Sequence, residues 1–221
     1  MDISFVIITA GHKPRHIKRL LNSIKKQNIQ NFESIIVGDT NDLNINPFHI
    51  VKIIEKKEAA IKGELGVMRN AGCRAAKFDN IVILDDDLLL TEFWYSNLVK
   101  FKKEYDILTC QIRVPDGGRY WDHACYQSPK NGHVTLEADQ EDDHLYMSGG
   151  CSWLMKTHVF KKIQYDSSEI YNMSNLKDYS DGKHNEDTYF AQRCRNEGFK
   201  IKHNHNSVAI HDDPTYTNLG R

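Results

Sequence analysis

Three consecutive carboxylates, Asp85, Asp86 and Asp87, stand between the apolar runs 80–84 and 88–90. The first run is rich in Ile, Val and Leu, which is typical of a strand buried on both faces. Burying three like charges at the end of such a strand is costly unless a cation neutralises them. Carboxylate oxygens suit Mg²⁺ or Mn²⁺ better than zinc, and these ions commonly bridge phosphate oxygens. The pattern predicts a metal–diphosphate site, with an acidic turn before a helix as the structural alternative.

Other residues able to do chemistry occur downstream. Glu186 and Asp187 begin a predicted helix, where the helix dipole favours acidic residues even without a catalytic role. His211 ends a strand-like tail and could complete a metal shell. The glycine pair 149–150 would let the backbone approach a ligand, and Trp153 offers a flat apolar face. An ordinary strand entry explains the glycines and the tryptophan equally well.

The elements that carry these residues alternate between strand and helix patterns. Strands are predicted at 3–8, 32–37, 50–54 and 80–84. Between the first two strands, four apolar residues fall on one helix face: Ile17, Leu20, Leu21 and Ile24. This alternation indicates an α/β fold with a mostly parallel sheet, which binds ligands outside the carboxyl ends of its strands. Asp39 and the triplet 85–87 fall at that edge.

The second half of the chain is less regular. We expect Thr91 to cap a helix and residues 106–114 to return as a strand. Residues 115–145 exceed an ordinary connection and form either a flexible loop or a small hairpin subdomain. The acidic run 137–143 within them is better explained as a solvated loop than as a site. The helix that begins at Glu186 is expected to end at Gly198.

Length and composition favour one domain of the α/β class. The 221 residues carry 29 Lys and Arg against 30 Asp and Glu, a net charge of -1, so nucleic acid is not an expected partner. The five cysteines are scattered and lack CxxC spacing, so neither a set of disulfides nor a cysteine-bound zinc site is expected. With strand-sized apolar runs and no leader pattern, we expect a cytoplasmic protein without a membrane span.

The first strand–helix turn, residues 9–14, lacks the glycine pattern of dinucleotide-binding folds. No GxxxxGK[ST] phosphate loop is present either. If phosphates bind to this chain, a metal ion must therefore provide more of the phosphate binding, which agrees with the Asp triplet.

Six segments in register resemble the family 2 glycosyltransferases, which have the GT-A fold. They are the first strand at 5–9, the L-x-S-I-x-x-Q helix at 20–27, the N-F-E-I-I-V-V-D-D-G-S strand at 31–40, the A-R-N-x-G segment at 66–72, the L-D-x-D metal motif at 84–87, and Gly149-Gly150 with Glu186-Asp187 as the acceptor-side and catalytic pairs. The resemblance covers nearly the whole chain. It implies a single domain over 1–221, with a Rossmann-like nucleotide-sugar-binding half at 1–114 and an acceptor and catalytic half at 115–221.

The resemblance assigns roles on the donor side. Thr9 and Asp39 would contact the nucleotide base, and Arg69 would lie near the diphosphate. Asp85 would lie near the ribose or reach the metal through water, and Asp87 would bind the Mn²⁺ or Mg²⁺ ion, with His211 as a further ligand. Asp86 belongs to the same donor-binding set without a specific role.

On the acceptor side, Asp187 matches the general base, with Glu186 as the next candidate. Gly149, Gly150 and Trp153 would face the acceptor, and the loops after 115 and 164 would recognise it or act as a lid. One departure concerns the donor motif: Gly38 stands where the first Asp is usual, and Thr40 replaces Gly. Asp39 is then the sole carboxylate for recognising a uracil.

The implied activity is metal-dependent, inverting transfer of a sugar from a nucleoside diphosphate sugar, expected to be a UDP-sugar, to a glycan hydroxyl. A nucleotidyltransferase would share the carboxylates and the metal, but it needs a basic loop that binds a triphosphate near the start of the chain. Lys13 and Arg15 are only a weak match to such a loop. A metal-dependent nuclease is suggested only by His203-Asn204-His205 within a strand-like run. A degenerate, lectin-like domain is the remaining alternative. The sugar, the acceptor, the linkage and the oligomeric state do not follow from the sequence.

Overall fold

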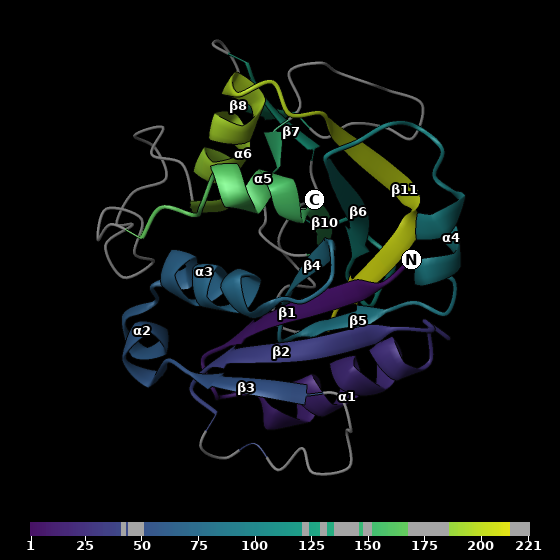
Figure 1. Ribbon diagram of the computed structural model, residues 1–221. Coiled ribbons are helices and arrows are strands. Elements are labelled where there is room, and N and C mark those ends of the chain that lie inside the picture. The colour runs from purple at the N-terminus through teal and green to yellow at the C-terminus, as the bar shows by residue number, and fades with distance from the viewer. Residues whose placement is uncertain are drawn as a thin grey trace.

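The structure is a computed structural model that describes residues 1–40, 43, 51–120, 124–128, 132–134, 146–147, 152–167 and 186–212. In this part of the chain, eight strands form one sheet in the order β3-β2-β1-β4-β10-β6-β11-β5 (Figure 1). Their bounds are β1 Ile3–Thr9, β2 Phe32–Gly38, β3 Val51–Glu55, β4 Asn80–Asp85, β5 Leu88–Leu90, β6 Ile107–Arg113, β10 Trp153–Lys156 and β11 Ile201–His211.

The sheet is mostly parallel, as the sequence predicts. Strands β3, β2, β1 and β4 are parallel neighbours, and β11 is parallel to β6. Strand β10 is antiparallel to both β4 and β6, and the short β5 is antiparallel to β11. The described sheet therefore has six strands in one direction and two in the other.

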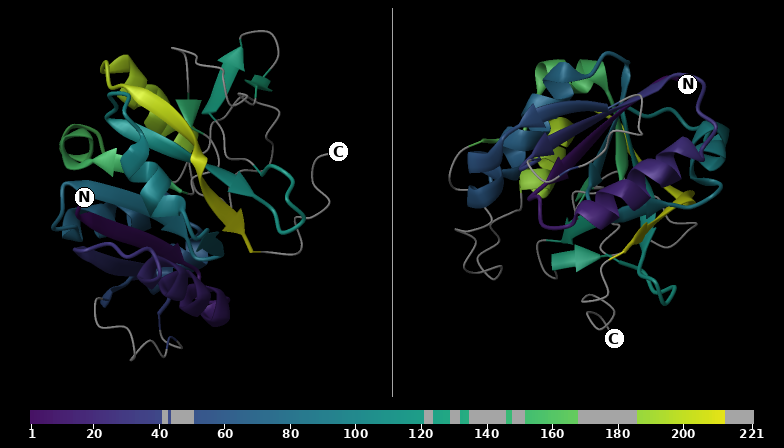
Figure 2. Two further views of the ribbon diagram at one scale, coloured as in Figure 1. Left: turned by 90° about the vertical axis from the view of Figure 1, so that its right-hand side faces the viewer. Right: turned by 90° about the horizontal axis from the view of Figure 1, so that it is seen from below.

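Helices cover both faces of this sheet (Figure 2). They are α1 Pro14–Lys25, α2 Lys57–Lys62, α3 Leu65–Ala75, α4 Trp94–Lys100, α5 Thr157–Lys162 and α6 Glu186–Asn196. Strand β1 shows how the core divides, because Ile3, Phe5 and Ile7 pack with α1 and α4. Val6 and Ile8 pack on the other face with residues of α2, α3, α5 and α6. Burial on both faces explains why this strand is mostly apolar.

A second, three-stranded antiparallel sheet has the order β8-β7-β9. Its strands are β7 Ala124–Ser128, β8 Gly132–Val134 and β9 Tyr146–Met147. This confirms the hairpin alternative for part of the insertion that follows β6. The acidic run 137–143 and the predicted acceptor glycines, Gly149 and Gly150, lie outside the described residues.

Local predictions failed where a partner distant in the chain decides the structure. Helix α4 begins at Trp94 with Phe93 at its N-cap, so the predicted Thr91 cap is wrong. The Thr91 hydroxyl instead donates to the backbone oxygen of Val208 at 2.7 Å, because β11 passes beside it. Strand β5 follows the Asp triplet for the same reason, since it pairs with the end of β11.

Gly38 is required by close packing of two strands. Its φ of +142° lies outside the region that L side chains favour, and a Cβ there would lie 1.8 Å from the backbone oxygen of Thr9. The Asp that is usual at this motif position would not fit. No described helix is long and apolar enough to cross a membrane.

Candidate functional site

The parallel strands bring the polar residues of the first half to one edge of the sheet. Thr9 pairs with Gly38, and Ile8 pairs with Asp85, so the carboxyl ends of β1, β2 and β4 are level. Asp39 directly follows β2, Asp85 is the last residue of β4, and Asp86 and Asp87 come directly after it. The predicted meeting of these residues at one edge is confirmed.

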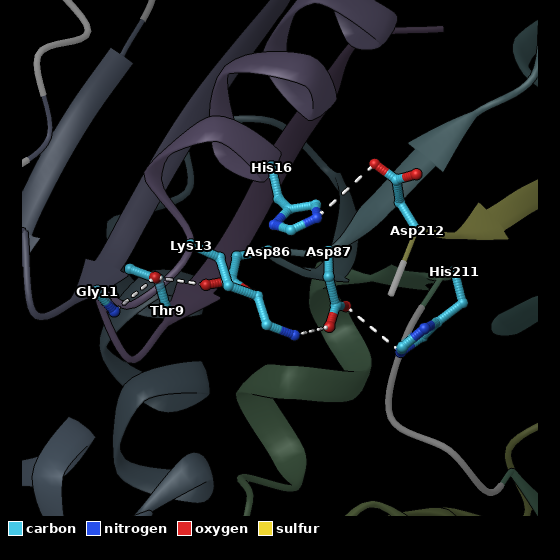
Figure 3. Close-up of polar contacts among 8 residues, drawn as sticks. All are labelled: Thr9, Gly11, Lys13, His16, Asp86, Asp87, His211 and Asp212. Atoms are coloured by element: carbon cyan, nitrogen blue, oxygen red, sulfur yellow. Dashed lines mark hydrogen bonds and ion pairs between the residues drawn. The ribbon is translucent and has the colours of Figure 1, made fainter. Parts of the chain in front are cut away.

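Thr9 and Asp86 hold the loop that follows β1 (Figure 3). The Thr9 hydroxyl donates to Oδ2 of Asp86 at 2.6 Å and accepts from the backbone N–H of Gly11 at 2.9 Å. Burial raises the pKa of the Asp86 carboxyl to about 6, although the bond from Thr9 opposes that shift. The Thr9 hydroxyl is used here and the residue is 2% exposed, so its side chain has a structural role. Its predicted contact with a base stays a prediction.

Asp87 lies between two basic side chains. Its Oδ2 accepts from the Lys13 ammonium at 2.9 Å, and its Oδ1 lies 3.5 Å from Nε2 of His211 (Figure 3). The His211 ring stacks on Tyr120, with ring centroids 4.2 Å apart. The backbone N–H of Asp212 donates to the backbone oxygen of Asp87 at 2.7 Å. The last residues of β11 are thereby joined to the triplet.

Asp212 adds a second connection between the end of β11 and the beginning of the chain. Its carboxylate forms an ion pair with Arg19 and lies 3.9 Å from Nε2 of His16, both on α1. Helix α1, the triplet and the end of β11 therefore enclose one polar region. Sequence reasoning had placed only His211 of this tail in the site.

The side chains of Asp87 and His211 suit a divalent ion. Oδ1 of Asp87 is buried and accepts no hydrogen bond from any described residue, while an imidazole nitrogen faces it. These two groups would supply two ligands, and phosphate oxygens and water would complete the shell. Among the described residues, no group of three or more His, Cys, Asp and Glu side chains is arranged to hold a metal by itself.

Arg69 forms ion pairs with two carboxylates of the candidate site. It is 2% exposed and forms an ion pair with Glu186, which is equally buried. Its other terminal nitrogen, Nη2, lies 3.5 Å from Oδ1 of Asp85. Arg69 therefore connects α3, the end of β4 and the first turn of α6, and its expected place near a diphosphate stays a prediction.

Asp187 is the neighbour of Glu186 in the first turn of α6 and is 3% exposed. Beneath this turn, Tyr165 stacks on Phe190 with ring centroids 4.1 Å apart. Burial raises the pKa of the Tyr165 hydroxyl well above its usual range, and the negative charge of Asp187 adds a smaller effect. The side chains of Asp187 and Tyr165 are therefore electrostatic neighbours. Tyr165 was missed because its segment carries no periodic pattern.

The predicted acceptor contact of Trp153 stays a prediction, and in the described structure this side chain is buried. Trp153 is 1% exposed, and its ring stacks on Tyr165 and Phe190 at 6.1 and 6.2 Å between centroids. Its flat face is used for packing beneath α6. The three rings form an aromatic layer that supports the first turn of this helix.

Asp39 directly follows β2 at the strand edge. Its side chain is 21% exposed, and the Lys57 ammonium lies 3.6 Å from it. Thr40, the other departure from the family motif, donates its hydroxyl to Glu55 at 2.5 Å. Thr40 thus fixes the turn after β2, and Asp39 is the carboxylate that faces outward there.

A comparison with protein families gives a match to the model described as glycosyl transferase family 2, over residues 4–164. The chain belongs to glycosyl transferase family 2. The match spans more than half of the sequence and includes β1, the Asp triplet and β10. No curated protein matches the sequence.

Solved structures give the same fold for this family 2 chain. The crystal structure of S. aureus TarS is 18% identical, with a TM-score of 0.67, over 96% of this chain and 37% of that chain. TarS 1-349 in complex with UDP is 18% identical, with a TM-score of 0.62, over 96% of this chain and 58% of that one. TarS 1-349 in complex with UDP-GlcNAc is 19% identical, with a TM-score of 0.60, over 96% and 56%. The fold is therefore of the GT-A type, and the chain spans only part of the length of these proteins.

Proposed function

We propose that this family 2 glycosyltransferase transfers a hexose from a UDP-sugar to a glycan hydroxyl, with inversion at the anomeric carbon and with Mn²⁺ or Mg²⁺ as cofactor. The main supporting observation is the strand edge where Asp39, the triplet 85–87 and His211 meet. TarS, which shares the fold, has been solved with UDP and with UDP-GlcNAc. In this proposal residues 1–114 bind the donor, and residues 115–221 supply acceptor contacts, the base and His211.

Each donor-side residue has a role that its position allows. Asp39, partly exposed directly after β2, accepts a hydrogen bond from the uracil imide. Asp85 lies towards the ribose, where its pairing with Arg69 fixes its carboxylate. Asp87 and His211 hold the ion, which neutralises the charge that develops on the leaving diphosphate. Asp86 acts indirectly, because its bond to Thr9 fixes the adjoining loop.

Asp187 is the better of the two candidate bases. Glu186 is ion-paired with the buried Arg69, so accepting a proton would break a desolvated pair. Asp187 would take the proton of the acceptor hydroxyl as that oxygen attacks the anomeric carbon from the face opposite the leaving group. Its burial keeps competing water away, and alignment rather than intrinsic basicity supplies the rate.

The activity is tested by incubating the protein with UDP-sugars, Mn²⁺ and candidate glycan acceptors and identifying the released nucleotide product. Release of UDP with a glycosylated acceptor supports the proposal. Release of pyrophosphate from a sugar phosphate and UTP would support a nucleotidyltransferase instead. Binding without turnover of any acceptor would favour a non-catalytic domain.

Replacing Asp87 with Ala is expected to abolish metal-dependent binding of UDP-sugars, because the buried oxygen that faces His211 is lost. Titration calorimetry with UDP in Mn²⁺ or in EDTA measures this effect. Asp79→Asn is the matched control, since Asp79 precedes β4 at the opposite end of the same strand and Asn preserves its bond from Thr157. Full metal-dependent binding by Asp87→Ala would contradict the assignment.

A further inference from the structure

Lys13 forms an ion pair with Asp87, the residue whose carboxylate the proposed function assigns to the metal ion. Its ammonium lies 2.9 Å from Oδ2 of Asp87, on the side of the carboxylate away from His211 (Figure 3). The Lys13 side chain is 33% exposed, whereas that of Asp87 is 11% exposed. The cation of this pair can therefore leave for solvent or a ligand, while the carboxylate stays in place.

The backbone around Lys13 is held firmly. Gly11 has a φ of +81°, and a Cβ there would lie 2.9 Å from the backbone oxygen of Asp39, so the turn is packed against the end of β2. The backbone oxygen of Lys13 accepts from the N–H groups of His16 and Ile17 at 3.0 and 3.3 Å, and Pro14 begins α1. The loop fixes the Cα of Lys13 beside the triplet, and only the four-carbon side chain needs to move.

Electrostatics makes the Lys13 position dependent on what is bound. Without a ligand, the ammonium offsets part of the repulsion among three adjacent carboxylates, and it lowers the otherwise raised pKa of Asp86. With a divalent cation on Asp87, an ammonium at the same carboxylate would be repelled. A diphosphate brought by that cation offers the ammonium a new anionic partner nearby.

We propose that Lys13 is a donor-binding residue that neutralises Asp87 in the unliganded protein and moves to the diphosphate when metal and nucleotide bind. This inference rests on the proposed function, because it takes a nucleoside diphosphate as the ligand. Lys13 thereby competes with the metal ion for Asp87 and favours the metal together with the nucleotide over the metal alone. No covalent bond is made or broken in this exchange, and only the hydrogen-bond partner of the ammonium changes.

The test uses Lys13→Met, which keeps the length of the side chain and removes its charge, with Lys13→Arg to restore the charge. Lys18→Met, an exposed change on α1, is the matched control. Mn²⁺ is first titrated into each protein without nucleotide. Lys13→Met is expected to bind Mn²⁺ about fivefold more tightly than wild type, which is the scale of a partly exposed ion pair. Lys13→Arg and Lys18→Met should remain close to wild type.

UDP is then titrated into each protein in saturating Mn²⁺. Lys13→Met is expected to bind UDP roughly tenfold more weakly, because one charged contact to phosphate is lost, and Lys13→Arg should regain most of that loss. Unchanged or weaker Mn²⁺ binding by Lys13→Met, or unchanged UDP binding, would overturn the inference. If wild-type protein bound no UDP at all, the proposed function would fail, while the first titration would still report whether Lys13 competes for Asp87.

Discussion

Replacing Asp187 with Asn is expected to lower turnover by about 10²-fold or more while leaving binding of the UDP-sugar intact. Asn has the same shape but cannot accept the acceptor proton, so the effect should fall on the chemical step. Glu186 cannot readily substitute, because its carboxylate is paired with Arg69. Turnover is measured as UDP release in the presence of acceptor, and donor affinity is measured separately by calorimetry.

Glu197→Gln is the control for this experiment, because Glu197 immediately follows α6 and forms an exposed pair with Lys162. It should leave turnover unchanged. Undiminished transfer by Asp187→Asn would remove Asp187 from the mechanism and make Glu186 the next candidate for the base. A parallel loss of donor affinity would place Asp187 in donor binding instead.

Replacing Glu186 with Ala is expected to destabilise the protein by about 3–5 kcal/mol. Arg69 is 2% exposed, and the variant would remove its buried partner Glu186. In the described contacts of the terminal nitrogens of Arg69, the remaining carboxylate is that of Asp85, at 3.5 Å. In a chain of this size, such a loss lowers Tm by roughly 10 °C. Urea or thermal unfolding followed by circular dichroism measures the change.

An exposed ion pair between the last residue of α5 and the residue after α6 is the comparison for this prediction. The Lys162–Glu197 pair is about half exposed on both sides, so Glu197→Gln should cost about 0–1 kcal/mol. The double variant Arg69→Met with Glu186→Leu should recover much of the loss, because it removes both buried charges. If Glu186→Ala cost as little as Glu197→Gln, the Arg69–Glu186 pair would not be desolvated, and its role in holding the first turn of α6 would be wrong.

The strand edge that carries Asp39 and the Asp triplet was predictable, because its position depends on local sequence patterns. Continuous apolar runs predict buried parallel strands, and parallel strands must place their carboxyl ends together. Asp39 and the triplet 85–87 therefore meet where the sequence places them. His211 was a candidate ligand, but its contact with Asp87 depends on the pairing of β11 with β5, which local patterns do not show.

The partners of individual side chains were not predictable. Arg69 lies 117 residues from Glu186 in the sequence. The family motifs predicted donor binding for Arg69 and a catalytic role for Glu186. Nothing in local spacing shows that these two charges neutralise each other. The stacking of Trp153 was unpredictable for a similar reason, because its partners Tyr165 and Phe190 come from other segments. Lys13 could have been suspected from its place between the first strand and Pro14, at the carboxyl edge of the sheet.

The most direct test of this account is a thermal-shift measurement with UDP-sugars, in Mn²⁺ and in EDTA, on wild type and Asp87→Ala. A donor at about 100 times its dissociation constant stabilises a protein by about 2.7 kcal/mol, which corresponds to roughly 5–10 °C for a chain of this size. We predict such a shift for wild type in Mn²⁺, a much smaller one in EDTA, and none for Asp87→Ala. The absence of any shift with UDP-sugars in wild type, or equal shifts in wild type and Asp87→Ala, would contradict the proposed metal-dependent donor site.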